Sequence, residues 1–145
     1  MVGLLLDTHA LYWLVSGEEE LSEEALVAIG ERQEIRALFV SPISAWEISI
    51  AVGKNRVADR PRLCDDPPDR WFRKAMRVAA ARIAPIGQAV AVEAAEVAAY
   101  TGHRDPGDCF LIATGRVKRL SIVTRDRTIQ SISAGEPGYL DVVAC

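Results

Sequence analysis

Five acidic residues in this 145-residue chain stand where their carboxylates could share a cation: Asp7, Glu47, Asp105, Asp108 and Asp126. Carboxylates that converge on one point repel each other unless a cation neutralises them. Because oxygen ligands alone select hard divalent ions, such a cluster predicts Mg²⁺ or Mn²⁺ at a site that handles phosphate groups. Where two such ions bind about 4 Å apart, one activates a water molecule and the other stabilises the leaving oxygen.

Each aspartate also has a simpler interpretation. Asp7 and Asp126 follow short apolar runs, where a strand would end and a helix begin, and Asp105 precedes Pro106 at a predicted helix start. Aspartates at such positions cap helices or form turns. A carboxylate in the first turn also gains about 0.3–1 kcal/mol from the helix dipole. Taken singly, the four aspartates are therefore better explained as capping or turn residues than as ligands.

Glu47 lacks this simpler explanation, because it lies in the middle of a predicted helix over residues 42–52. Ile43, Trp46 and Ile50 have the spacing of an apolar stripe on this helix, and Glu47 falls inside the stripe. Burying a lone carboxylate costs free energy unless a partner, a metal or a proton compensates. Two interpretations remain: a glutamate at the edge of the stripe that pairs with an arginine, and a carboxylate directed at a bound cation.

The elements that must position these acids alternate between short apolar runs and longer helical patterns. We predict strands at 2–6, 38–40, 121–124 and 140–143, and an edge strand or irregular link at 83–86, where Pro85 interrupts the pattern. We predict helices at 8–15, from 22 onward, and at 42–52, 70–82, 89–100, 106–118 and 127–132, and an exposed loop at 56–68. This alternation predicts the α/β class, with one domain over residues 1–145 and a parallel sheet flanked by helices. Ligands bind beyond the carboxyl ends of the strands in such sheets, where Asp7 and Asp126 would lie.

Composition excludes several other classes of function. No apolar run approaches the roughly 18–20 residues of a membrane span, so no membrane association is predicted. The two histidines, His9 and His103, form no zinc motif with the cysteines, and neither a catalytic triad nor a Gly-rich phosphate loop is recognisable. Cys64, Cys109 and Cys145 show no paired spacing, which favours a reducing cytoplasm.

At the acidic residues and around them, the sequence resembles the PIN-domain family, and within it the ribonuclease toxins of VapBC toxin–antitoxin modules. The matching segments are LLLDTHALYWL (4–14), SPISAWEISI (41–50), HRDPGDCFLIATG (103–115) and VTRD (123–126). Their order and separations match, and the resemblance covers almost the whole chain. No single segment is specific, but their combination is.

The resemblance implies roles for individual residues. The catalytic, metal-binding quartet of the family carries over to Asp7, Glu47, Asp108 and Asp126. Asp105 belongs to the DPxD pattern of the subgroup and is a fifth candidate metal ligand. Thr8 and Thr124 fall where small hydroxyl residues support the site. Gly107 and Cys109 are departures, because relatives often have a bulkier residue before the third acid and arginine after it. The missing arginine puts a nearby phosphate or packing contact in doubt.

The resemblance also implies how the protein works. It predicts a three-layer α/β/α domain with a short, mostly parallel sheet that uses Mg²⁺ or Mn²⁺ and cleaves RNA in the cytoplasm. It also predicts a small antitoxin as partner and inhibitor. Since several carboxylates give the pocket a negative potential, we expect an antitoxin arginine to reach Asp7, Glu47 or Asp108.

A homodimer is the second expectation about partners. The resemblance implies it, and the sequence supports it loosely. Leu11, Trp13, Leu14 and the alanine-rich helix around Val97 carry more apolar surface than one small core requires.

Two other classes of function are weighed against this one. The first is another metal-dependent α/β enzyme, such as a phosphatase. Haloacid-dehalogenase phosphatases also place an aspartate after their first strand but require Asp-x-Asp, whereas this chain has Asp7-Thr8-His9. The second is a non-catalytic binding module whose acids only cap helices, and Glu47 argues against it.

Overall fold

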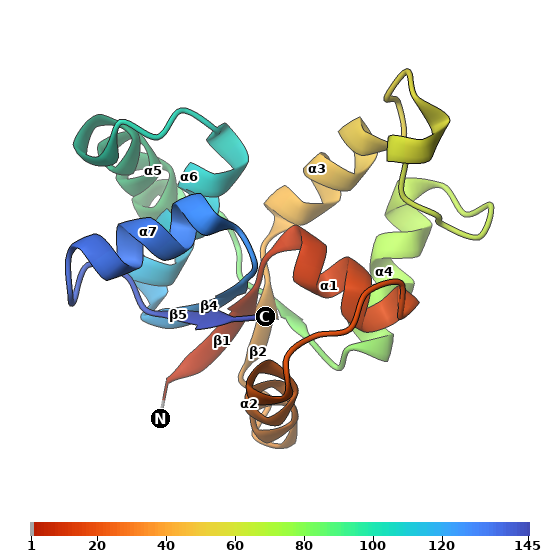
Figure 1. Ribbon diagram of the computed structural model, residues 1–145, viewed down its shortest axis with the longest axis horizontal. Helices are drawn as coiled ribbons and strands as arrows, with labels where there is room; N and C mark the ends of the chain where they lie inside the picture. Colours follow the sequence, from red (N-terminus) through yellow and green to blue (C-terminus); the bar gives the residue numbers. More distant parts are fainter. Residues whose placement is uncertain (1) are drawn as a thin grey trace.

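A five-stranded sheet forms the centre of the molecule. In a computed structural model that describes residues 2–145, the strands lie in the order β3-β2-β1-β4-β5, and every pair of neighbours is parallel (Figure 1). The strands are β1 (Gly3–Leu6), β2 (Leu38–Val40), β3 (Arg82–Ile83), β4 (Leu120–Thr124) and β5 (Val142–Ala144). The predicted α/β class with a short parallel sheet is therefore confirmed.

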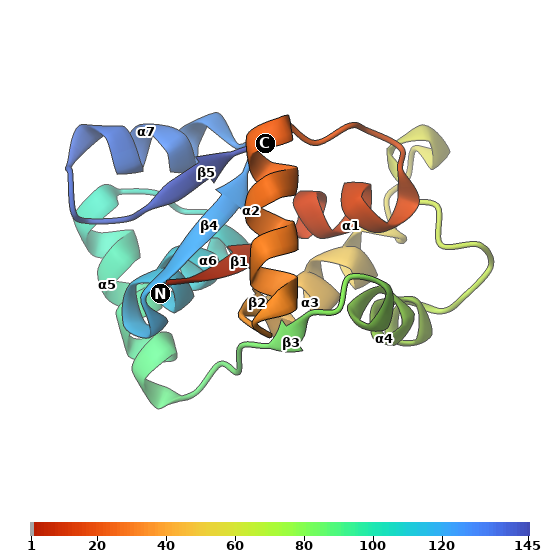
Figure 2. The ribbon, with the colours of Figure 1, turned by 90° about the horizontal axis from the view of Figure 1, so that it is seen from below.

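Helices cover both faces of this sheet and complete the three layers. They are α1 (Thr8–Ser16), α2 (Glu23–Glu34), α3 (Pro42–Ala51), α4 (Pro68–Val78), α5 (Gln88–Thr101), α6 (Pro106–Lys118) and α7 (Arg127–Gly135). In both ribbon views α5, α6 and α7 gather on one side of the molecule and α1, α3 and α4 on the other (Figures 1 and 2). No helix of residues 2–145 is long and apolar enough to cross a membrane.

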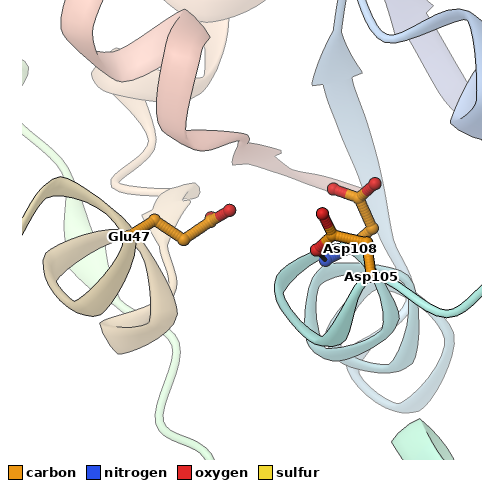
Figure 3. Close-up of side chains that lie close together, drawn as sticks. All are labelled: Glu47, Asp105 and Asp108. Carbon is orange, nitrogen blue, oxygen red and sulfur yellow. Dashed lines mark hydrogen bonds between the residues drawn. The ribbon is translucent and has the colours of Figure 1, made fainter. Parts of the chain in front are cut away.

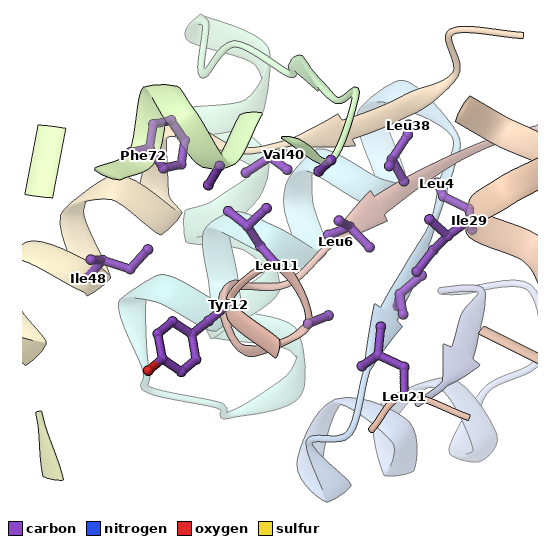
Figure 4. Packing of buried hydrophobic residues seen from close by; sticks show 14 of the residues in the cluster. Leu4, Leu6, Leu11, Tyr12, Leu21, Ile29, Leu38, Val40, Ile48 and Phe72 are labelled. Carbon is purple, nitrogen blue, oxygen red and sulfur yellow. The ribbon is translucent and has the colours of Figure 1, made fainter. Parts of the chain in front are cut away.

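The central strand β1 contributes to a separate core on each face. Leu4 and Leu6 pack against α1, α2 and α4 (Figure 4). Leu5 packs against α5, α6 and α7 on the other face. Side chains of successive strand residues point to opposite faces, so a run of leucines serves both cores. This explains why the first apolar run of the sequence is continuous and does not alternate with polar residues.

The apolar residues that we took as support for a homodimer belong to these cores. Leu11 and Val97 have no exposed surface, and Trp13 and Leu14 are half-buried against the first core. For these four side chains the sequence argument was wrong, because it counted one core where the sheet builds two. The alanine-rich helix around Val97, α5, does carry exposed apolar side chains on its outer side, and others lie on α3.

Some boundaries differ from the prediction. Helix α4 begins at Pro68, since proline suits the first helical position, and it ends at Val78, before Ala80 adopts a positive φ of 51°. The shorter helix places β3 at Arg82–Ile83, so that this edge strand ends before Pro85. The predicted exposed loop at 56–68 contains a short 3-10 turn, Val57–Asp59.

Candidate metal centre

Three of the five candidate acids cap helices beside the carboxyl edge of the sheet. Asp7 follows β1 and accepts a hydrogen bond from the Ala10 amide at 2.7 Å; Asp105 caps α6 and Asp126 caps α7 in the same way. The prediction that these three aspartates cap helices is thus correct. In each cap it is Oδ1 that accepts the amide hydrogen bond, so the cap leaves the second carboxylate oxygen for another ligand.

Glu47 is positioned by a helix face different from the predicted one. Trp46 and Ile50 are about half exposed, and the inward face of α3 is formed by Ser44 and Ile48. The predicted stripe of Ile43, Trp46 and Ile50 was therefore wrong, because the hydrophobic spacing on this helix also fits an outward surface. Glu47 is half-buried beside Ser44, and its side chain extends from α3 toward the start of α6 (Figure 3).

Glu47 meets two of the aspartates at the start of α6. One carboxylate oxygen each of Glu47, Asp105 and Asp108 lie within 4.8 Å of one another (Figure 3). A cation between such oxygens would contact all three, at the 2.0–2.6 Å typical of Mg²⁺ and Ca²⁺ ligation. The structure thus brings together residues from α3 and α6, and it places Asp105 inside the set.

The other two aspartates lie in an adjoining hollow. Asp7 and Asp126 line a hollow of about 210 Å³ together with His9, Trp13 and Arg125. The hydroxyl of the buried Thr124 accepts a hydrogen bond from the Asp126 amide at 3.0 Å. The Thr124 side chain also forms a hydrogen bond with the Asp7 carboxylate. Asp7 is thus placed beside the cluster and not within its three closest oxygens.

Burial and repulsion by neighbouring carboxylates raise the pKa values of Asp7, Glu47 and Asp108. The pKa of Asp7 is raised mainly by burial, with a further contribution from the charge of Asp108. The pKa of Glu47 and that of Asp108 are also raised mainly by burial, and neighbouring aspartates raise both further. These directions mean that the charged forms of the acids are unfavourable in the folded protein, and that a bound cation would relieve the cost.

The Thr8 hydroxyl holds one oxygen of the Glu47 carboxylate. The Thr8 hydroxyl donates to Oε1 of Glu47 at 2.5 Å and lies 2.9 Å from the hydroxyl of Ser44. Ser44 is fully buried, so Thr8 satisfies a group that would otherwise lack a partner. The position proposed for Thr8 from the sequence therefore coincides with a contact that orients one of the acids.

His103 is a site residue that the sequence interpretation missed. Its Nε2 lies 2.7 Å from Oδ2 of Asp108, and this contact lowers the pKa of Asp108 against the effect of burial. A lone histidine is most often a surface or capping residue, and in the sequence His103 was considered as a possible zinc ligand but not as a residue of this site. The available signal was its place five residues before Asp108, on the loop that leads into the Asp105 cap.

Gly107 is the second residue that the sequence interpretation missed. A methyl group at this position would stand 2.6 Å from Oε2 of Glu47 and 3.3 Å from Oδ1 of Asp105. Only glycine therefore lets the Glu47 carboxylate approach the start of α6 this closely. In the sequence, Gly107 stood out only as a departure from the resembling family, where a bulkier residue is common.

We predict that Gly107→Ala weakens Mn²⁺ binding about tenfold, the lower end of the range for residues that orient metal ligands. The added methyl group displaces the carboxylate of Glu47, while the fold tolerates alanine in the first turn of a helix. Titration calorimetry with Mn²⁺ measures the affinity. The control is Gly30→Ala in α2, where a methyl group meets no atom within 4 Å. Equal Mn²⁺ affinity of the Gly107→Ala variant and the unmodified protein would show that Glu47 is not a ligand.

The donor set fits Mg²⁺ or Mn²⁺. All three closest donors are carboxylate oxygens, which are the ligands that hard divalent ions prefer. Structural zinc sites instead use nitrogen and sulfur ligands. The raised pKa values of Glu47 and Asp108 and the partial burial of these two residues give the ion a role in neutralising charge. The chemistry of the residues present therefore agrees with the metal predicted from the sequence.

A three-layer domain with carboxylates gathered at the carboxyl edge of a parallel sheet defines a class of metal-binding α/β proteins. Within that class, the sequence model of the PIN domain matches residues 4–135, so the chain belongs to the PIN-domain family, whose members are nucleases that generally use divalent metal ions. No curated protein matches in a direct sequence comparison.

Solved structures with the same fold come from toxin–antitoxin complexes. The chain is similar to a chain of VapBC2 from Rickettsia felis bound to a promoter DNA fragment, with 11% identity, a TM-score of 0.67 and coverage of 100% of this chain and 99% of that chain. It is similar to a chain of a toxin–antitoxin complex from Klebsiella pneumoniae, with 24% identity, a TM-score of 0.60 and coverage of 97% and 96%. It is also similar to a chain of FitAcB from Neisseria gonorrhoeae, with 20% identity, a TM-score of 0.62 and coverage of 96% and 95%.

Proposed function

We propose that this protein is a Mg²⁺- or Mn²⁺-dependent endoribonuclease that acts in the cytoplasm as the toxin of a type II toxin–antitoxin module. The observation that carries the proposal is the convergence of Glu47, Asp105 and Asp108, with Asp7 and Asp126 beside them, in a PIN domain. The similarity of the fold to chains of VapBC and FitAB complexes supports the toxin assignment.

The chain's own residues would perform three tasks. Glu47, Asp105 and Asp108 would hold a divalent ion, with Asp7 and Asp126 completing the acidic site. When bound, such an ion neutralises phosphate charge and lowers the pKa of water. Thr8 orients Glu47 and His103 orients Asp108, so both carboxylates are fixed before the substrate arrives. Fixed charges of this kind cost no rearrangement at the moment of reaction.

The direct test is cleavage of a labelled single-stranded RNA by the purified protein. We expect cleavage products in Mn²⁺ or Mg²⁺ and none in EDTA. A single-stranded DNA of the same sequence is the second substrate and compares cleavage of RNA with cleavage of DNA. Asp126→Asn is the control for contaminating nucleases, because asparagine preserves the helix cap and removes the charge. Cleavage that persists in EDTA or in this variant would refute the proposal, and the absence of any cleavage would favour a binding module.

The proposed function predicts how the antitoxin inhibits. An arginine of the antitoxin should pair with Asp7, Glu47 or Asp108, because its planar fork matches carboxylate geometry. Replacing that arginine by alanine should restore RNA cleavage in the reconstituted complex, and increasing Mn²⁺ should restore it in part. Activity of the complex, measured across a Mn²⁺ titration, tests this. If neither change restores cleavage, the antitoxin acts by covering the RNA-binding surface.

We also propose a homodimer, on the basis of the family and of exposed apolar surface on α5, which includes the predicted helix around Val97, and on α3, which was not predicted. Trp46 and Ile50 on α3 are about half exposed, as is Val92 on α5, where a shallow apolar hollow also includes Tyr100. Exposed apolar surface of this kind is typical of interfaces between protein chains. Sedimentation at micromolar concentration should give twice the mass of the chain, and a monomer would contradict the proposal.

A further inference from the structure

An aromatic pair stands on α1 directly beside the acidic site. The rings of His9 and Trp13 are one helical turn apart, with their centroids separated by 5.4 Å and their planes inclined by 35°. His9 is exposed and Trp13 is half-buried. The guanidinium of Arg125 lies over the Trp13 ring, 4.4 Å from its centroid. Three flat groups thus follow one another, with the exposed His9 at one end and Arg125, whose side chain is 39% exposed, at the other.

Arg125, at one end of this series, is anchored by hydrogen bonds to backbone carbonyl groups. Arg125 donates hydrogen bonds to the Cys145 carbonyl at 2.6 and 3.1 Å and to the Glu20 carbonyl at 2.6 Å, and its guanidinium lies 3.8 Å from the Glu19 carboxylate. These contacts come from the end of the chain and from the loop that follows α1. They fix the plane of the guanidinium, and a cation over an aromatic face holds the indole in turn.

The pair borders two hollows, and the first of them contains two of the acids. The first is the hollow of about 210 Å³ that His9 and Trp13 share with Asp7 and Asp126. The second has a volume of about 290 Å³ and includes His9, Trp13, Tyr12, Ile48 and Thr8, which bonds Glu47. An RNA strand that places a phosphate in the first hollow, at Asp7 and Asp126, therefore lies beside the exposed ring of His9.

We propose that His9 and Trp13 form a stacking platform for one nucleobase next to the scissile phosphate, and thereby select single-stranded RNA. This inference rests on the proposed ribonuclease function. A base pair inside a duplex offers no free face, whereas an unpaired base stacks on an aromatic ring with little dependence on sequence. The two rings cap no helix and are not ligands in the acidic cluster. A stacking platform would supply affinity for RNA that a negatively charged site lacks.

The test uses the Asp126→Asn variant, which we expect to bind RNA without cleaving it, and an eight-nucleotide labelled RNA in Mn²⁺. Fluorescence anisotropy gives the Kd for this RNA and for eight others, each with an abasic site at a different position. We expect His9→Ala to weaken binding of the intact RNA about tenfold and His9→Phe to preserve it. At one abasic position the effect of His9→Ala should disappear, because the base that stacks is already missing.

The control is Val78→Ala, which removes an exposed apolar side chain at the end of α4 and should leave every Kd unchanged. Melting curves establish that the His9 variants fold. If His9→Ala weakens binding equally at all abasic positions, or not at all, the platform does not hold a base and the proposal fails. If His9→Ala does not change RNA binding, the His9–Trp13 pair would be a contact for a protein segment. Absence of metal-dependent RNA cleavage by the unmodified protein would instead refute the proposed function.

Discussion

Asp7→Asn should lower RNA cleavage at least about 100-fold while the melting temperature stays close to that of the unmodified protein. Asparagine accepts the hydrogen bond from the Ala10 amide as aspartate does, so α1 keeps its cap. The carboxylate charge is lost at a buried position beside the other acids, and removing one fixed charge that acts on the transition state typically costs two to three orders of magnitude. Initial rates in saturating Mn²⁺ and thermal melting measure the two effects.

Two companion variants make this result interpretable. Asp7→Ala removes both the charge and the cap, so it should lose activity and about 1 kcal/mol of stability. Asp69→Asn changes an exposed aspartate on α4 and should alter neither. An Asp7→Asn variant that cleaves RNA at the original rate would exclude Asp7 from the catalytic site.

Glu47→Gln should abolish cleavage and, in the absence of metal, make the protein more stable. The variant removes one charge from a group of carboxylates whose pKa values are raised by burial and by one another. The gain should be about 1 kcal/mol, which corresponds to about 3 °C in melting temperature for a chain of this size. Bound Mn²⁺ stabilises the original protein and should reverse the order.

The dependence of stability on pH follows from the same raised pKa. A carboxyl group whose pKa is higher in the folded state keeps its proton longer there, so the folded state binds more protons and stability falls as pH rises. For Glu47 this loss begins near the ordinary pKa of 4.5 and is complete above the raised value. In EDTA, Glu47→Gln should therefore gain little at pH 4 and most at pH 7.

Melting curves in EDTA and in Mn²⁺ at both pH values test this prediction. Glu96→Gln is the matched control, because Glu96 is an exposed glutamate in the middle of α5 and has no place in the site. A Glu47→Gln variant that melts at a lower temperature in EDTA would mean that contacts of the carboxylate, such as that with Thr8, outweigh the repulsion.

Local sequence signals were sufficient for most of the fold. The apolar run before Asp7 predicted a strand because both faces of β1 are covered, and Asp105-Pro106 predicted the start of α6 through capping and proline geometry. The strand that ends at Thr124 was predicted for the same reason as β1. Because parallel strands end at one edge, these signals also indicated that the aspartates would gather there.

Contacts between elements could not be predicted in the same way. The apolar spacing around Glu47 was consistent with two helix faces, and only the packing of Ser44 and Ile48 decides between them. Gly107 and His103 act on residues of the site through distances of a few ångströms across elements. Their residue types carry no signal of that role, since glycine and histidine at a helix start have commoner explanations.

The central claim is that carboxylates from separate elements hold a divalent ion. It is tested most directly by the anomalous diffraction of Mn²⁺ in crystals of the protein. We predict an anomalous peak within about 2.5 Å of carboxylate oxygens from Glu47 and from Asp108 or Asp105, and loss of this peak in Glu47→Gln. A peak elsewhere on the molecule, or none at millimolar Mn²⁺ with the five acids ordered, would contradict the claim.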